Sequence, residues 1–321
     1  MDLYPYKFTP IYKEKIWGGR NLARLLGRDL SGDASIGESW ELADLAEGTS
    51  VVSNGPERGR TLTELTETLG DALLGGAAPE KGRFPLLLKY LDANDKLSLQ
   101  VHPDAEAVER IGGDAALKTE CWYVLESRDG YIYKGVEPDV TPAQFREAIK
   151  QNAVERLVRR YDVSAGDFHY LPAGTVHALC AGVVVAEVQT PSDTTYRVTD
   201  WGRGREIHVD RSMECIHFEP AADAPPGAEG ETLLVTAFFT VARRELAAGE
   251  RRDLPVGRCT ALMFLSGDAP ARIECTGGAD VDVTGGRGET LLVPAGLESA
   301  AVIAESGCVC LEVTLPVDSL N

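Results

Sequence analysis

Two segments of the chain share one pattern of glycine and proline, and this internal repeat constrains the fold more than any other feature. Residues 166–177 read GDFHYLPAGTVH, and residues 288–299 read GETLLVPAGLES. The two copies agree at every glycine and proline but end differently, on His177 in the first and Ser299 in the second. Each copy predicts a strand, a tight Pro/Gly turn and a returning strand whose first residue points inward. The chain is therefore expected to contain the same small β unit twice.

This repeated pattern resembles the second sequence motif of the cupin family. Cupins are small antiparallel β-barrels that use the histidine of this motif as a metal ligand. The resemblance implies a mainly β chain of two cupin-like (jelly-roll) β-barrels with a small helical insertion. Because only the first copy keeps its histidine, one metal ion per chain is expected, in the N-terminal barrel.

A segment rich in proline, alanine and acidic residues indicates where the two halves meet. Residues 218–230 read FEPAADAPPGAEG, a composition typical of a linker. We therefore expect an N-terminal catalytic cupin domain over residues 1–217, with a helical insertion near 104–160. The C-terminal cupin-like domain, over residues 231–321, would lack the metal-binding histidine and be structural.

Helix signals are few and strand signals are many. Capping boxes at Thr61 and Thr141 predict helices near 62–69 and over 142–160. Elsewhere, short apolar runs are punctuated by Gly, Pro and Asp, which predicts short strands. These are expected at 97–102, 120–125, 183–189, 233–241, 260–265, 289–293 and 308–314.

Charge and cysteine content limit the partners and the compartment. The formal net charge of −18 argues against nucleic acid and against an anionic membrane as partners. The N-terminus has no apolar targeting segment, and no run is long enough to span a membrane. Seven cysteines without a C-x-x-C motif are interpreted as free thiols in a reducing cytoplasm.

Four residues, two of them among the five histidines of the chain, lie in patterns that suit a metal. Alternation along a strand places Gln100 and His102 on one face. Two polar side chains that point into a barrel are costly unless something satisfies them. Glu120 and His177 would complete a set of one amide oxygen, two imidazoles and one carboxylate. Such ligands suit Zn²⁺ with an open position, and also Mn, Co, Ni or Fe.

Beyond these ligands, several segments spread over the first 210 residues together resemble type I mannose-6-phosphate isomerase in its short bacterial form. The resemblance implies reversible interconversion of mannose 6-phosphate and fructose 6-phosphate at a zinc site. It assigns Gln100, His102, Glu120 and His177 as zinc ligands and Arg197 as the active-site arginine. Pro191 departs from the family pattern before Arg197, and because proline has no backbone N–H, a differently shaped strand end is expected there. The segments are YPYKFTPIYKEKIWGG, GESWELAD, FPLLLKYLDANDKLSLQVHP, KTECWYVL, AGDFHYLPAGTVHAL and EVQTPSDTTYRVTDWGR.

Aldose–ketose isomerisation moves a proton between C1 and C2 through a cis-enediol, and so requires a base. Glu187 lies in the apolar run VVVAEV, where burial would raise the pKa of its carboxyl toward a useful range. Lys118 lies two residues before Glu120 and is the second candidate. Arg197, always protonated, could face the negative charge that develops.

A phosphorylated substrate also needs cationic or donor groups beside the metal. Lys96 and Ser98 precede Gln100 at even spacing, so they are expected on its face as substrate-binding residues. Two other readings stay open, because fold does not fix function. One is an iron-dependent cupin oxygenase, which would need neither Lys96 nor Arg197. The other is a sugar-phosphate binding protein without turnover.

Overall fold

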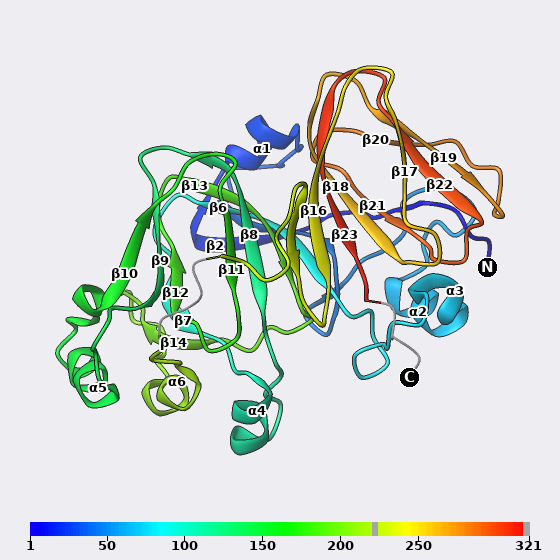
Figure 1. The fold of residues 1–321 in the computed structure, drawn as a ribbon. Helices are drawn as coiled ribbons and strands as arrows, with labels where there is room; N and C mark the ends of the chain where they lie inside the picture. The colour runs from blue at the N-terminus through cyan, green and yellow to red at the C-terminus, as the bar shows by residue number, and fades with distance from the viewer. Residues whose placement is uncertain (220–223, 317–321) are drawn as a thin grey trace.

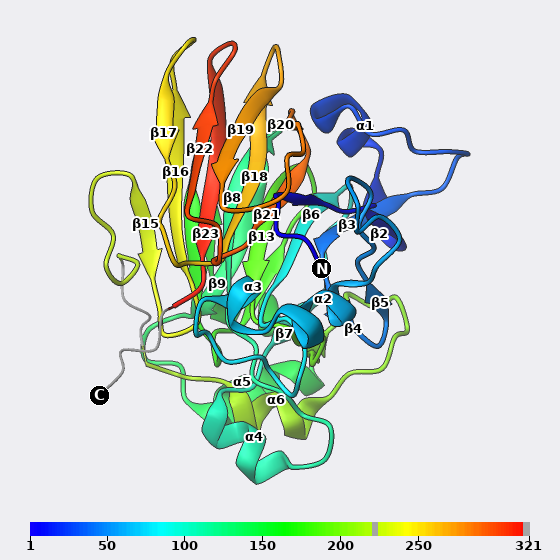
Figure 2. The same cartoon turned by 90° about the vertical axis from the view of Figure 1, so that its right-hand side faces the viewer.

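The computed structural model describes residues 1–219 and 224–316, and within them the chain is mainly β (Figure 1). The strands form two barrel-like pairs of antiparallel sheets, one from each half of the chain, that lie side by side (Figures 1 and 2). The prediction of a mainly β chain with two cupin-like barrels and few helices is confirmed.

The N-terminal barrel pairs a six-stranded sheet with a five-stranded sheet. The first has the order β11-β8-β13-β6-β3-β2 and the second the order β10-β9-β12-β7-β14. The strands of the six-stranded sheet are β2 (Ile11–Gly19), β3 (Ile36–Leu42), β6 (Leu87–Ala93), β8 (Glu120–Ser127), β11 (Phe168–Leu171) and β13 (Val183–Gln189). Those of the five-stranded sheet are β7 (Leu99–Val101), β9 (Tyr131–Val136), β10 (Val158–Asp162), β12 (His177–Leu179) and β14 (Tyr196–Thr199).

The C-terminal barrel pairs another six-stranded sheet with a four-stranded sheet. Their orders are β1-β21-β18-β23-β16-β15 and β17-β22-β19-β20. Apolar side chains of both sheets, among them Leu262, Phe264, Leu291 and Val302, fill the space between them. The strands are β1 (Tyr6–Lys7), β15 (Thr232–Val235), β16 (Thr240–Leu246), β17 (Arg251–Asp253), β18 (Thr260–Gly267), β19 (Ala271–Thr276), β20 (Val283–Gly285), β21 (Thr290–Val293), β22 (Ser299–Ile303) and β23 (Cys308–Thr314).

The repeated motif occupies matching places in the two barrels. In each copy the chain leaves the six-stranded sheet, turns, and enters the other sheet of the same barrel, from β11 to β12 and from β21 to β22. Gly166 and Gly288, which open the copies, both have positive φ, where a side chain would be strained. The turn thus carries the chain across each barrel.

The two barrels share one hydrophobic core, because the strands of the N-terminal six-stranded sheet have two apolar faces. On β6, Leu88 and Tyr90 point toward the C-terminal barrel, where they join a cluster that includes Met263 and Leu311. Leu91, one residue on, belongs to the interior of the N-terminal barrel. Alternation along the strand therefore decides which residues reach the interior and which join the barrels together.

The expected division of the chain at 218–230 does not describe the sheets fully. Strand β1 pairs with β21, so Tyr6 and Lys7 belong to the C-terminal sheet although they stand at the start of the chain. Of the expected linker, residues 220–223 lie outside the described part. The pairing of β1 with β21 and the shared hydrophobic core therefore tie the N-terminal segment to the C-terminal barrel.

The helices are short and lie at the ends of the barrels (Figures 1 and 2). The capping boxes at Thr61 and Thr141 are confirmed. The helix expected over 142–160 ends at Lys150, because Asn152 adopts a left-handed backbone and residues 158–162 form β10. The helices are α1 (Asn21–Leu26), α2 (Leu62–Leu69), α3 (Asp71–Leu74), α4 (Ala105–Ile111), α5 (Pro142–Lys150) and α6 (Val209–Cys215).

One strand prediction was also wrong. Residues 233–241 form no single strand, because a turn separates β15 from β16. The Thr236 hydroxyl accepts hydrogen bonds from the backbone N–H groups of Phe238 and Phe239, which stabilises this turn. All seven cysteines are free thiols. In the described part of the chain, no helix has the length and apolar character needed to cross a membrane.

Candidate metal centre and substrate cavity

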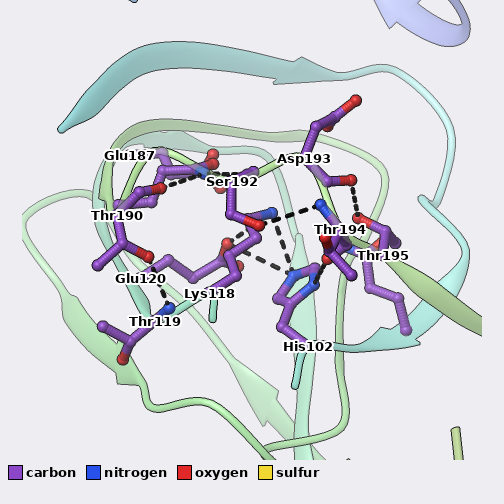
Figure 3. A network of polar contacts seen from close by, with 12 residues as sticks. His102, Lys118, Thr119, Glu120, Glu187, Thr190, Ser192, Asp193, Thr194 and Thr195 are labelled. Atoms are coloured by element: carbon purple, nitrogen blue, oxygen red, sulfur yellow. Dashed lines mark hydrogen bonds and ion pairs between the residues drawn. The ribbon is translucent and has the colours of Figure 1, made fainter. Parts of the chain in front are cut away.

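Three buried side chains converge inside the N-terminal barrel: Glu120 and His177 are the first residues of β8 and β12, and His102 directly follows β7. The ligand atoms of His102, Glu120 and His177 all lie within 4.8 Å of one another, and it is the one such group in residues 1–219 and 224–316. The Nε2 of His177 lies 3.1 Å from Oε1 of Glu120, and the Nε2 of His102 lies 3.5 Å from its Oε2. Figure 3 shows His102 and Glu120 pointing toward each other.

Backbone carbonyls orient both imidazoles. The Nδ1–H of His102 donates to the carbonyl of Thr194 at 2.9 Å, and that of His177 donates to the carbonyl of Thr175 at 2.8 Å. These bonds fix the tautomer in which each Nε2 carries a lone pair that faces Glu120. Burial, followed by the nearby Lys118, lowers the pKa of His102 well below its usual value, which keeps this imidazole neutral.

The Glu120 carboxylate is fully buried, yet neither oxygen accepts a hydrogen bond. Burial opposes its charged form, but the adjacent Lys118 ammonium favours it, and the pKa of this carboxyl lies well below its usual range. A buried anion of this kind needs cationic partners. The Lys118 ammonium is one, 3.0 Å from Oε2 of Glu120 and 3.2 Å from Nε2 of His102.

Gln100 is the fourth residue of the predicted set, and β-sheet register brings it here. It pairs directly with His177 across β7 and β12, and its amide nitrogen lies 3.4 Å from Nε2 of His177. Turning the amide over would present its oxygen at this place. Two imidazoles, a carboxylate and an amide oxygen are a donor set that fits Zn²⁺. The structure therefore brings all four predicted ligands together.

A cavity of about 170 Å³ lies beside this cluster. Gln100 and Lys118, which contact the cluster, also line the cavity. It is strongly polar. Five cationic side chains and three carboxylates line it, so its walls carry net positive charge in a chain of net charge −18. The cations are Lys15, Lys89, Lys118, Arg197 and Arg205, and the acids are Glu38, Glu187 and Asp193.

Glu187 lines the cavity as expected from its lone acidic position in β13. Its Oε2 accepts a hydrogen bond from the Trp122 indole at 2.8 Å, and its Oε1 lies 3.2 Å from the Lys89 ammonium. Burial raises the pKa of this carboxyl, although Lys89 acts in the opposite direction. A buried carboxyl with a raised pKa beside a cavity is a candidate for proton transfer.

Lys89 and Glu38 were missed in the sequence. Lys89 is a single charge inside the apolar run LLLKYL, and a buried lysine requires a partner, so a signal was present. Burial disfavours its charge, but Glu187 and Glu38 outweigh burial and raise the pKa of Lys89. Glu38 also pairs with Lys15 at 2.9 Å, and its pKa is lowered to about 2 because Lys89 and Lys15 outweigh its burial.

Of the two residues predicted to bind substrate, one lies at the cavity and one does not. Ser98 lines the cavity, and its hydroxyl is 3.3 Å from Oε1 of Gln100. Lys96 is directed elsewhere, since its ammonium pairs with Glu155 at 3.2 Å and lies over the Trp201 ring. The prediction that even spacing places Lys96 on the same face as Gln100 fails, because β7 begins only at Leu99.

Two arginines reach the cavity instead, from β14 and the loop after it. The Nε of Arg197 is buried and has no hydrogen-bond partner among the described residues. Arg205 is held in place by two bonds to the buried carboxylate of Asp200, at 3.0 and 2.5 Å. Sequence reasoning missed Arg205; the signal that could have identified it is the run DWGRGR, in which an aspartate precedes two arginines.

A mainly β chain with two barrels, one of which gathers Gln, His, Glu and His beside a cationic cavity, has the architecture of a cupin-type enzyme. The family model of the phosphomannose isomerase type I catalytic domain matches residues 6–138. The mannose-6-phosphate isomerase of Streptococcus mutans is 38% identical over 248 residues, which cover 73% of this chain and 76% of the relative. The mannose-6-phosphate isomerase ManA of Bacillus subtilis is 38% identical over 261 residues, covering 77% and 81%.

A solved structure agrees with these relatives. The crystal structure of mannose 6-phosphate isomerase from Bacillus subtilis superposes with a TM-score of 0.82 at 30% identity, covering 97% of this chain and 99% of that one. The chain belongs to the type I mannose-6-phosphate isomerase (phosphomannose isomerase) family, which is a family of isomerases. The resemblance read from the sequence is confirmed.

Proposed function

We propose that this enzyme reversibly interconverts mannose 6-phosphate and fructose 6-phosphate through a cis-enediol at a zinc site. The observation that carries the proposal is the buried His102–Glu120–His177 cluster at the edge of a cavity with cationic walls. A sugar phosphate combines hydroxyl oxygens that suit a metal with a dianionic group that suits arginine and lysine. The choice of this particular reaction rests on membership of the family.

Gln100, His102, Glu120 and His177 would hold one Zn²⁺ per chain. When bound, this ion supplies Lewis-acid polarisation of the sugar oxygens next to the carbon that loses its proton. Everything else in the reaction is assigned to side chains of this chain.

Glu187 is proposed to carry the proton between C1 and C2. A carboxylate that transfers a proton must have its oxygens held and its pKa raised toward the working pH, and burial raises the pKa of Glu187. The Trp122 indole and the Lys89 ammonium hold the oxygens. Lys118, between Glu120 and the cavity, is proposed to stabilise negative charge on the sugar oxygens and is the second candidate for the base.

Arg197 and Arg205 are proposed to bind the phosphate, with Ser98 as a further donor. An arginine presents a planar fork to phosphate oxygens, and Arg197 carries unused donor capacity into the cavity. Lys96 has no part in this assignment, because its ammonium lies at Glu155.

Catalysis is proposed to be confined to the N-terminal barrel. The apolar filling of the C-terminal barrel and the replacement of the motif histidine by Ser299 both support a structural role for the second barrel. Seven free thiols support a reducing compartment, the cytoplasm, as the place of the reaction.

The decisive assay supplies mannose 6-phosphate and detects fructose 6-phosphate with purified protein, first as isolated, then after chelation, then with Zn²⁺ restored. Turnover that disappears with chelator and returns with Zn²⁺ is the expected result. A folded, zinc-loaded sample without turnover would overturn the proposal. Running the reaction in D₂O tests the route. Deuterium bound to C1 or C2 is the expected result, because an enediol requires proton loss to a base, whereas a hydride shift brings no solvent hydrogen to carbon.

A further inference from the structure

Helix α6 is flanked by two histidines that the proposed chemistry leaves without a role. His208 precedes its first residue and His217 follows two residues after its last. The helix packs against β14, β7 and α4, and Figure 1 shows it below β7 and β14. Each histidine bonds to a different part of the site.

His208 holds the backbone of Arg197 at both of its polar groups. The N–H of His208 donates to the carbonyl of Arg197 at 2.7 Å, and the N–H of Arg197 donates to Nδ1 of the His208 ring at 3.0 Å. On its other side, Arg197 pairs with Gln100 across β7 and β14. His208 is therefore attached to the strand that carries the arginine.

His217 holds the turn that carries the metal-binding histidine. Its N–H donates to the carbonyl of Gly174 at 2.9 Å. Its ring lies so close to Gly174 that a Cβ there would be 2.5 Å from Nδ1, and the φ of +86° at Gly174 also favours glycine. The Nε2–H of the same ring donates to Oδ2 of Asp104 at 2.7 Å.

These contacts link His217 to both segments that carry the imidazoles of the metal cluster. Asp104 stands two residues after His102, and the N–H of Gly174 donates to the carbonyl of His102 at 2.8 Å. The next residue along the turn, Thr175, accepts the bond from Nδ1 of His177. A single side chain thus touches the segments that carry two metal-binding imidazoles, from a helix that contributes no ligand itself.

We propose that His217 is a positioning residue for the metal site. By fixing the turn at Gly174 against the segment from His102 to Asp104, it sets the distance at which the two imidazoles face Glu120. Metal binding tolerates errors of only about 0.2 Å in ligand position, and removing a residue that orients ligands typically costs about 10- to 100-fold in metal affinity. The inference rests on the proposed zinc site.

The test measures the zinc affinity of the metal-free protein by competition with a chromophoric chelator, without any assay of turnover. His217→Ala is expected to weaken zinc binding by about 10- to 100-fold. His217→Gln keeps an N–H donor toward Asp104 and is expected to recover much of the loss. Arg211→Ala is the matched control, since Arg211 lies on the same helix but pairs with Glu214 at the surface, and it is expected to leave zinc affinity unchanged.

A second variant keeps the proposal falsifiable if His217→Ala folds poorly. Asp104→Ser retains a good cap for α4, where Asp104 now accepts the N–H of Ala107 at 2.7 Å, but cannot hold His217 in the same way. It is expected to weaken zinc binding, and the double variant is expected to be no weaker than His217→Ala alone.

Three results would overturn the inference. The first is wild-type zinc affinity in folded His217→Ala. The second is an equal loss in Arg211→Ala, which would point to a general weakening of α6. The third is full additivity of Asp104→Ser and His217→Ala. Failure of the wild-type protein to bind zinc would instead refute the proposed metal site, and this inference with it.

Discussion

Lys89 and Glu187 face each other on paired strands, and the Lys89 ammonium lies 3.2 Å from Oε1 of Glu187. Both side chains are almost fully buried, and both line the substrate cavity. A lysine in this position stabilises the ionised carboxylate, whereas burial stabilises the protonated form. The balance leaves the pKa of Glu187 raised, and removal of its charge is the most direct test of its role.

Glu187→Gln is expected to lower kcat by about 10²- to 10⁴-fold with little change in KM, because the amide keeps the shape but cannot take a proton. Steady-state kinetics with mannose 6-phosphate measures this. Glu126→Gln is the matched control, since Glu126 belongs to the same sheet but pairs with Arg24 and Arg128 at the surface, and it is expected to leave the kinetics unchanged. A kcat close to wild type in Glu187→Gln would move the base to Lys118.

His102→Ala is expected to reduce bound zinc from about one ion per chain to almost none and to abolish turnover, because three remaining ligands hold the ion poorly. Elemental analysis after dialysis measures the metal. His169→Gln serves as a control, since His169 is a histidine of the same barrel whose ring lies outside the cluster. Full zinc content in His102→Ala would show that His102 is not a ligand.

Arg205→Ala is expected to raise the KM for mannose 6-phosphate by about 10-fold or more and to weaken competitive inhibition by inorganic phosphate to a similar degree. Lys96→Ala is the comparison. Its ammonium pairs with Glu155 outside the cavity, so neither constant is expected to change. If Lys96→Ala raised KM and Arg205→Ala did not, Lys96 and not Arg205 would bind the phosphate.

Acid is expected to destabilise the fold in part through His169. Burial is the main reason that the pKa of His169 falls from its usual 6.5 to about 4. The unfolded chain therefore takes up this proton first as the pH falls, so stability is highest above about pH 6.5 and declines toward pH 4. In urea unfolding, His169→Phe is expected to reduce the pH slope of the unfolding free energy by at most about 1 kcal/mol per pH unit. An unchanged slope would contradict the assignment.

Leu311→Ala is expected to destabilise both barrels together. Leu311 is buried in the core that joins them, and such a truncation costs about 2–5 kcal/mol. Calorimetry is expected to show one transition that moves to lower temperature as a unit. Two separated transitions, with only one displaced, would mean that the barrels unfold independently.

The sequence predicted best what depends on local pattern. Alternation placed Gln100, in β7, on the same side as His102, which directly follows that strand, and the repeated turn located His177. The same reasoning failed for Lys96, because alternation holds only within a strand and β7 starts after it. It also extended one helix past Asn152, since the spacing of Phe145, Ile149 and Leu157 continues a helical pattern beyond the point where the backbone leaves it.

The residues that sequence reasoning missed depend on contacts between distant segments. Glu38 and Lys89 reach the predicted Glu187 only because β3, β6 and β13 are neighbours, an order that no local pattern specifies. Arg205 reaches the cavity because Asp200 holds it, through a loop in which Trp201 adopts a left-handed backbone and its indole donates to the carbonyl of Leu97. Such geometry follows from tertiary packing.

The pairing of Tyr6 with Leu292 has a consequence for how the protein is made. Synthesis on the ribosome proceeds from the N-terminus, so the first strand waits for its partner until nearly the whole chain has been translated. Contacts of such long sequence separation form slowly, and an unpaired strand edge invites association with other nascent chains. The last step of folding in the cell would then be the closure of the C-terminal sheet over the oldest part of the polypeptide.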